Sequence, residues 1–531
     1  MIRMSDRAMS ETFLMDRLDE VFSICGEDIL ERIGTGHISP AAYDTGFVAR
    51  ISDDEGNPEF PQTLDWLVAN QRDDGSWGSD IHHEYDRFIN PLSASIALQE
   101  RGHSPGSVAM AEAYLTQAIH RLEGADEGIT SDHLVAMLME EAREVGLDIP
   151  YDHSPHRPLG PLKKLLLSWR YVDAEHPVGH FVELLGRFPS QKRVTQALQM
   201  PDGSIMNSTS STAASIVFDP RLERDHAYYD KLLYLRDSLV EGGGVFHFWD
   251  LDVMETAYGL YNLMRAGYPQ RLVSKRASLL EENWRQDGLS FSRHFPPCDL
   301  DDTALGYIVL SYVGREPDPR VFDAYWKRDH FVTYTVESRG RPGPNIHALE
   351  ALARSSHPHR DALIEATLRW LRGEMVDGNH FVDEWHLSPA YVTSHAIFAF
   401  HLTEEALMER CVEYFLDTQR DDGSWGFTSN GNGLSTIEET AFALQGLLYY
   451  DRNAGHVDPA AIQLGVGFLL DSYPAARYPE MWVSKVLYSP GNIIESLVQG
   501  VLHTFRHGGT RAGEGSPERT REGGIWNGPK R

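Results

Sequence analysis

The stretch Gln71-Arg72-Asp73-Asp74-Gly75-Ser76-Trp77-Gly78 decides the fold, because versions of it recur along the chain. A close copy runs from Gln419 to Gly426, and a shorter copy runs from Gln199 to Ser204. Weaker copies are Trp284 to Ser290 and Asp377-Gly378. The Asp-Gly pair predicts a tight turn with glycine at positive φ, and the glutamine and tryptophan can tie that turn to neighbouring helices.

Each turn unit follows one helical pattern and precedes a second, more apolar one, as in Leu92 to Leu98, Thr212 to Val217 and Thr303 to Leu310. Helix pairs that alternate between an outer and an inner layer close into an α/α barrel. No run of alternating residues argues for a substantial sheet. The sequence therefore predicts an all-α fold, with structural rather than catalytic roles for Trp77 and Trp425.

Length and charge limit the possible functions. A chain of 531 residues, 41% of them apolar, is long enough for two or three domains with sizeable cores. Its formal charge of −30 makes nucleic acid or an anionic membrane an unfavourable partner, since both are bound through Lys and Arg. An anionic substrate would need a local basic pocket.

Cysteine usage and the terminus indicate the compartment. Cys25, Cys298 and Cys411 are odd in number and far apart, which argues against a disulfide framework or a cysteine-based zinc site. The N-terminus lacks a signal-peptide pattern, and no uncharged apolar run is long enough to span a bilayer. We expect a cytoplasmic protein without a transmembrane segment.

The acidic run Asp299-Leu300-Asp301-Asp302 opens an apolar stretch that continues to Tyr312. Taken alone, such a run is typical of a helix cap with solvated acids. The stretch that follows is apolar nearly all round, so its helix should be buried with the acids facing an interior. Repulsion and desolvation raise the pKa of packed carboxyls, and one that stays protonated could act as a general acid towards an alkene.

This run resembles the Asp-x-Asp-Asp signature of class II terpene cyclases, the family of copalyl diphosphate synthases and, more distantly, squalene–hopene cyclases. The segment Ile38 to Phe47, which contains Ala-Tyr-Asp-Thr, and the first turn unit are also similar to that family, except that Gly46 replaces a usual alanine. The resemblance extends to about Pro490. It implies that Asp301 donates the proton and that Asp299 and Asp302 are its flanking partners.

The resemblance also implies a domain organisation of two α/α barrels. Residues 10–37 would join 265–531 in a β domain that carries the acid, and residues 38–264 would form an inserted γ domain. The Gly-rich, charged tail from about Arg506 is predicted to be disordered. No Asp-Asp-x-x-Asp segment or additional α domain of the ionising class I type is expected.

A substrate diphosphate would be held, by the same resemblance, with Mg²⁺ at Glu123, Asp126 and Glu127. Gly124 occupies the place of one acid of the family pattern. Lys164 falls where the family has a lysine that contacts the diphosphate. Without the resemblance, the three acids would be interpreted as solvated residues before a helix, and Lys164 as a residue on the solvent-exposed face of a second helix.

Two further positions concern the acid and the last step. His247 replaces an asparagine that positions the water acting as terminal base in the plant enzymes, although a histidine between Phe246 and Phe248 is also typical of a core. Asn345 or His347 lies at the distance of the family asparagine that orients the acid.

Aromatic residues are the candidates for the lining of the substrate cavity. Trp385, Tyr391, Trp482 and Tyr488 could stabilise carbocations through their ring faces, or could simply pack between helices.

The implied reaction is protonation of geranylgeranyl diphosphate and cyclisation to a bicyclic copalyl-type diphosphate, with the diphosphate retained. Farnesyl diphosphate giving a drimenyl-type product is the alternative within the class, and squalene fits less well because it needs no diphosphate site. Other α/α barrels include zinc-dependent prenyltransferase subunits, inverting glycosidases and non-catalytic binding toroids. The oligomeric state, monomer or homodimer, is left open.

Overall fold

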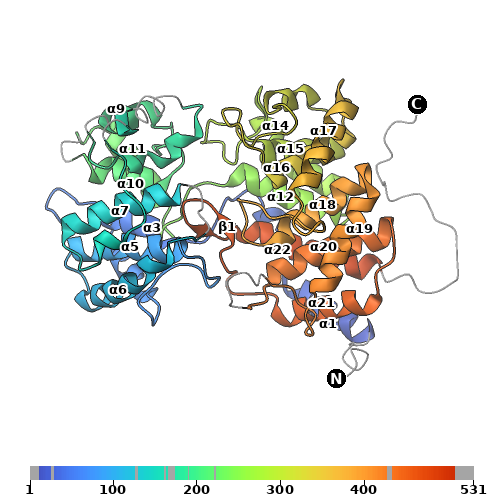
Figure 1. Ribbon diagram of the computed structural model, residues 1–531, viewed down its shortest axis with the longest axis horizontal. Coiled ribbons are helices and arrows are strands. Elements are labelled where there is room, and N and C mark those ends of the chain that lie inside the picture. The colour runs from blue at the N-terminus through green and yellow to red at the C-terminus, as the bar shows by residue number, and fades with distance from the viewer. Residues whose placement is uncertain are drawn as a thin grey trace.

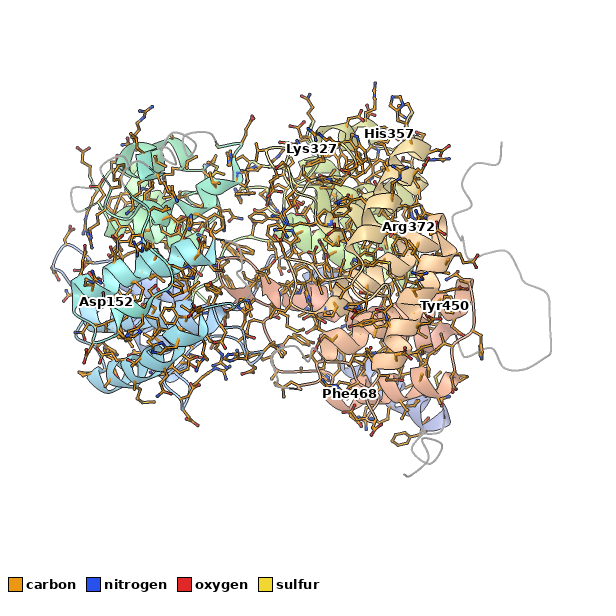
Figure 2. The ribbon with its side chains drawn as sticks, viewed as in Figure 1. Asp152, Lys327, His357, Arg372, Tyr450 and Phe468 are labelled. Carbon is orange, nitrogen blue, oxygen red and sulfur yellow. The ribbon has the colours of Figure 1, made fainter. Side chains whose placement is uncertain are left out.

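The computed structural model describes residues 11–25, 29–125, 130–160, 163–165, 174–188, 191–219, 223–426 and 433–508. The described chain forms two helical lobes, with β1 between them (Figure 1). Asp152 marks the outer side of one lobe and Arg372 that of the other (Figure 2). None of the described helices combines the length and apolar character needed to cross a membrane.

The first lobe is built mainly from helices of the N-terminal half. Its elements are α3 (Ala42–Ala49), α4 (Pro61–Ala69), α5 (Asp86–Glu100), α6 (Pro105–Ala118), η2 (Ile119–Arg121), α7 (Ser131–Val145), η3 (Tyr151–His153), η4 (Pro177–Leu185), α9 (Gln191–Leu198), α10 (Thr209–Val217) and α11 (His226–Asp237).

The second lobe combines the N-terminal helices with the C-terminal half. Its elements are α1 (Glu11–Cys25), α2 (Ile29–Arg32), α12 (Asp252–Arg265), α13 (Gln270–Arg276), α14 (Ser278–Asn283), α15 (Leu300–Tyr312), η5 (Pro319–Ala324), α16 (Pro342–Arg354), α17 (Arg360–Glu374), α18 (Pro389–Thr403), α19 (Glu405–Thr418), α20 (Ile437–Asn453), α21 (Pro459–Ser472) and α22 (Gly491–Gly508).

Each lobe contains a closed ring of inner helices. In the second lobe α12, α15, α16, α18, α20 and α22 pack each on the next, and α22 returns to α12. In the first lobe the ring passes through α3, α5, α7, η4 and α10 and returns to α3. Two α/α barrels are thus observed, and the all-α prediction is confirmed.

The two layers of a barrel differ in how their helices are buried. The inner helix α15 is buried from Leu300 to Leu310 except at Asp301. The outer helix α17 buries only one stripe, formed by Leu363, Thr367, Leu368 and Leu371. An all-round apolar sequence therefore marks the inner layer, and a single stripe marks the outer layer.

The repeated turn units have the structural role that the sequence predicts. Trp77 Nε1 donates to the Leu67 carbonyl at 2.8 Å, and Trp425 Nε1 donates to the Phe415 carbonyl at 2.9 Å. Gly75 has a φ of +88°, and a Cβ there would lie 2.4 Å from the carbonyl oxygen of Met110 on α6. The turn therefore needs glycine both for its backbone angle and for the close approach of a helix.

The predicted boundary between residues 264 and 265 differs from the structure. The core of the second lobe includes Leu14 to Ile38 and then resumes at Phe246, so the whole of α12 belongs to that lobe. The core of the first lobe runs from Ala41 to Val245, joined by Val486. The predicted tail begins at Arg506 inside α22, and its residues 509–531 lie outside the described ranges.

A short hairpin joins the two cores. Its strands are β1 (Trp482–Val483) and β2 (Leu487–Tyr488), the only strands within the described ranges. Trp482 and Tyr488 belong to the core of the second lobe, whereas Val486 at the tip belongs to the core of the first. The amide of Leu487 donates to Asp86 Oδ1 at 2.9 Å. The hairpin therefore anchors one barrel in the other.

Candidate active site

The acidic run lies at the start of α15, as its sequence predicts. The side chain of Asp299 accepts the main-chain N–H of Asp302 at 2.9 Å and caps the helix. Asp299 and Asp302 are both buried. Asp299 therefore caps the helix although it is buried, and the carboxyl groups of Asp299 and Asp302 face the interior of the barrel.

Burial controls the protonation of the two flanking acids. Desolvation raises the pKa of Asp299, and the nearby Asp301 charge adds to this effect. Desolvation also raises the pKa of Asp302 well above its usual range, with a further contribution from Asp299. Asp302 Oδ1 has no hydrogen-bond partner among the described residues. Asp299 and Asp302 therefore bind a proton more readily than exposed aspartates do.

Asp301 is in contact with two histidines that the inner helices bring together. Asp301 Oδ1 lies 2.6 Å from His347 Nδ1, and His347 Nε2 lies 2.7 Å from His395 Nδ1. The three residues come from α15, α16 and α18, which are neighbours in the inner ring. The side chain of Asp301 is 13% exposed, whereas that of His347 is 1% exposed.

His395 ends this series of contacts. Burial lowers the pKa of His395 well below its usual value, and the neighbouring His347 and Arg265 act in the same direction. Its Nε2 has no hydrogen-bond partner among the described residues. Burial therefore favours the neutral form of His395.

Asn345 takes a different position from the one expected for a residue that orients the acid. Its side chain is buried and bonds to both main-chain groups of Phe331, at 2.8 and 2.9 Å, and to the Arg341 carbonyl at 2.8 Å. These contacts fix the loop before α16. The structure thus brings His347, the other candidate for this place, against Asp301.

Aromatic rings surround the acid and its histidines. The hydroxyls of Tyr258 and Tyr391 are 3.0 Å apart, and both rings lie about 6.1 Å from the His347 ring. The ring of Trp482 lies 5.5 Å from Tyr258, and its Nε1 donates to Glu438 at 2.7 Å. Tyr391 and Trp482, two of the predicted cavity residues, therefore belong to the group of rings packed around His347 and Tyr258.

Trp385 lies at the edge of this site, with its ring under the Arg341 guanidinium at 5.4 Å. Its main-chain N–H donates to Asp383 Oδ2 at 3.1 Å. Burial raises the pKa of Asp383 to about 6, with a further contribution from the Asp301 charge. Asp383 is thus a further acid near Asp301 that sequence analysis missed.

The residues predicted for the diphosphate and metal are only partly described. Glu123 is exposed, and Asp126 and Glu127 lie outside the described ranges. Lys164 Nζ lies 3.7 Å from Glu140 on α7. Within the described chain no group of three His, Cys, Asp or Glu side chains could hold a metal ion.

His247 lies apart from the acid, at the junction of the lobes. Its side chain is fully buried, with Nδ1 2.7 Å from Asp44 Oδ2 and Nε2 3.0 Å from Ser484 Oγ. A cavity of about 610 Å³ also opens between the lobes, but neither Asp301 nor His247 lines it. His247 is thus a bonded histidine whose partners come from both lobes.

The fold and the buried acid place the chain in a known class of enzyme. A type B diterpene cyclase from Mycobacterium tuberculosis is 30% identical over 497 residues, which are 88% of this chain and 96% of that protein. The chain belongs to the class II terpene cyclase family and is an enzyme of that class. No protein-family model matches the chain.

Other relatives agree with this assignment. The ent-copalyl diphosphate synthase of Streptomyces platensis superimposes with a TM-score of 0.74 at 23% identity, over 92% of this chain and 99% of that one. The chloroplastic copalyl diphosphate synthase 1 of Isodon rubescens is 28% identical over 375 residues, 68% of this chain and 46% of that protein. The chain thus matches less than half of the plant enzyme.

Proposed function

We propose that the enzyme protonates a linear C20 prenyl diphosphate, most simply geranylgeranyl diphosphate, and cyclises it to a bicyclic copalyl-type diphosphate. The contact between Asp301 and His347 carries this proposal. The Nδ1–H of His347 would donate to Asp301 Oδ1, so the second carboxyl oxygen would hold the proton given to the alkene. The same hydrogen bond would then stabilise the carboxylate left after the transfer.

The names of the relatives support a C20 substrate. The Mycobacterium relative is named a diterpene cyclase, and the plant relative is named a copalyl diphosphate synthase. Farnesyl diphosphate with a drimenyl-type product is the alternative within the class. Membership in an enzyme family favours either of these over a non-catalytic toroid.

The proposed reaction begins at the terminal alkene. Asp301 protonates it, and the tertiary cation that forms is attacked by the next double bond until two rings are closed. The faces of Tyr258, Tyr391 and Trp482 would stabilise these cations, each by roughly 1–2 kcal/mol in a dry site. Loss of a proton or capture of water ends the reaction, and the product keeps its diphosphate group when it is released.

The direct test is incubation with C15 and C20 prenyl diphosphates in the presence of Mg²⁺, followed by phosphatase treatment and mass spectrometry with chiral standards. A bicyclic C20 alcohol that is absent with Asp301→Asn supports the proposal. A bicyclic C15 alcohol formed in preference would assign the drimenyl alternative instead. Failure to consume any prenyl diphosphate would overturn both.

His347 should affect the chemical step. We expect His347→Ala to lower kcat about 100-fold, because it removes the only described side chain that bonds Asp301 Oδ1. His347→Asn should retain more activity than His347→Ala, since its amide can still donate to the carboxylate. Steady-state kinetics at saturating substrate measures this, and a His347→Ala enzyme with the wild-type kcat would contradict the assigned role.

The headgroup residues should affect binding. We propose that Mg²⁺ arrives with the diphosphate and that Glu123, Asp126, Glu127 and Lys164 contact this pair. Lys164→Ala should raise KM about tenfold with little change in kcat, because a charge-assisted contact is worth ~1.5–3 kcal/mol. Glu123→Ala should change mainly the Mg²⁺ dependence.

Lys163→Ala is the matched control for this prediction, because Lys163 is the exposed neighbour of Lys164 on the same short segment. It should leave KM unchanged. If Lys164→Ala and Lys163→Ala behave alike, the diphosphate is bound elsewhere.

A further inference from the structure

A second cavity, of about 540 Å³, opens within the first lobe between the first turn unit and the helices α5 and α6. Its polar and charged lining residues are Asp74, His82, Arg87, Tyr114, Gln117 and Arg121. None of these residues belongs to the acid site, and none is among those proposed to hold the substrate diphosphate. The cavity therefore needs an explanation of its own.

The guanidinium of Arg87 is buried at this cavity without a counterion. Arg87 is 7% exposed, and its Nη1 donates to Ser76 Oγ at 2.7 Å. Its Nε has no hydrogen-bond partner, and no carboxylate of the described residues forms an ion pair with it. The carboxylate of Asp86 is used elsewhere, since it accepts the N–H groups of Ser79 and Leu487. An unpaired buried charge is costly, so the cavity favours an anion.

A comparison of two turn units shows that the turn itself does not require this charge. Asp74 Oδ1 accepts the N–H and O–H groups of Ser76 at 3.0 and 2.6 Å. Asp422 and Ser424 repeat these contacts at the same distances in the second lobe. The hydroxyl oxygen of Ser76 then accepts from Arg87, whereas the hydroxyl of Ser424 contacts another serine hydroxyl. A neutral group is therefore sufficient to complete the turn.

The helices α6 and η2 add further donors to the cavity. Arg121 Nη2 donates to Tyr114 Oη at 3.2 Å, and its Nε donates to Glu84 at 3.0 Å. Burial raises the pKa of Tyr114, so its hydroxyl keeps its hydrogen at neutral pH. Because the hydroxyl oxygen already accepts from Arg121, that hydrogen is available to a ligand. Glu84 balances the charge of Arg121 but not that of Arg87.

Asp74 determines which anions fit. Its carboxylate lines the same cavity. Although desolvation acts in the opposite direction, hydrogen bonds from Ser76 and the nearby Arg87 charge lower the pKa of Asp74. An ionised carboxylate repels a fully deprotonated oxyanion, but it accepts a hydrogen bond from an oxyanion that carries an O–H group. Inorganic phosphate carries such a group at neutral pH, whereas sulfate does not.

We propose that this cavity is a binding site for inorganic phosphate, separate from the active site. The Arg87 guanidinium donates to phosphate oxygens, and the Tyr114 hydroxyl donates to a further oxygen. The P–OH group donates to Asp74. This inference goes beyond the proposed function and does not depend on it.

The test is isothermal titration calorimetry of the full-length enzyme with inorganic phosphate at pH 7, in a low-salt chloride buffer without Mg²⁺. We expect one phosphate per chain, with sulfate bound at least about tenfold more weakly. Tyr114→Phe should weaken phosphate binding about fivefold and Arg121→Gln about tenfold, because each removes one donor at a partly exposed position. Arg87→Gln should abolish measurable binding. Circular dichroism melting checks that each variant is folded.

Asp74→Asn tests the selectivity of the site. The amide oxygen can still accept from Ser76, while the amide N–H can donate to an oxyanion. The preference for phosphate over sulfate should therefore fall from at least about tenfold to less than about threefold. Asp422→Asn is the matched control, because Asp422 makes the same turn contacts in the second lobe. It should leave the affinities for both anions unchanged.

The remaining outcomes would overturn the site. A wild-type enzyme that shows no saturable phosphate binding contradicts it, and so does one that prefers sulfate. If Lys164→Ala weakens phosphate binding as much as Arg121→Gln, phosphate occupies the proposed headgroup site instead. Binding that neither Tyr114→Phe nor Arg121→Gln changes shows an adventitious ion only, and this pair decides the question if Arg87→Gln does not fold. Cyclisation is tested separately with Asp301→Asn, so failure of the phosphate site leaves the proposed function intact.

Discussion

Asp301→Asn is expected to lower kcat by about 10⁴-fold, the upper end of what general acid catalysis contributes. The amide keeps the size of the side chain and can still accept a hydrogen bond from His347, 2.6 Å away from Asp301 in the wild type. It cannot deliver a proton to carbon. No other described acid combines partial exposure with a contact to the paired histidines. Single-turnover kinetics with the proposed C20 prenyl diphosphate measures this effect on the chemical step.

The stability of the Asp301→Asn variant is the control for this result. Replacing one acid beside Asp299 and Asp302 removes a like charge, so the melting temperature should hold or rise. Substrate binding should persist, because the residues proposed to hold the diphosphate are unchanged. A folded variant that binds substrate and cyclises it near the wild-type rate would refute the acid assignment.

Lys485→Ala is expected to lower the free energy of unfolding by about 3–5 kcal/mol, because it leaves the Glu183 carboxylate buried without its partner. The ammonium of Lys485 also bonds Ser208 at 2.6 Å and Ser210 at 3.0 Å. These partners lie in the first lobe, whereas Trp482 and Tyr488 hold the hairpin in the second. Guanidinium denaturation followed by circular dichroism measures the change.

A double variant separates charge from packing. Adding Glu183→Gln to Lys485→Met removes both charges and keeps most of the side-chain volume, so most of the lost stability should return. An unfolding midpoint that is the same in Lys485→Ala and the wild type would show that the ion pair contributes nothing to stability.

The repeated turn units made the barrel fold predictable from sequence. Their Asp-Gly pairs fix local backbone angles, and the alternation of one-sided and all-round apolar helices is visible in a single chain. The lobe boundary was less predictable. Whether α12 packs in the first or the second lobe depends on contacts with α15 and α22, which are distant in sequence.

The position of the acidic run at the start of a buried helix was predictable because three carboxyl groups before an apolar stretch are an unusual pattern. Its histidine partner was not, since Asn345 and His347 are two residues apart on α16 and point to nearly opposite faces. Choosing between them requires the rotation of α16 relative to α15. His395 escaped notice because a single polar residue within a buried helix carries no local signal. The motif that contains Asp44 was noted, but its contact with His247 was not predictable because the two residues are 203 positions apart.

The hairpin from Trp482 to Tyr488 has a consequence for engineering. Its stem contributes to the core of the second lobe, and its tip supplies Lys485 and Val486 to the first lobe. In a chimaera that takes its first barrel from one parent and its second barrel from another, the hairpin tip of the second parent would therefore contact Glu183 of the first parent. Recombination should succeed when residues 480–489 travel with the first barrel, even though they lie between α21 and α22 of the second barrel in the chain.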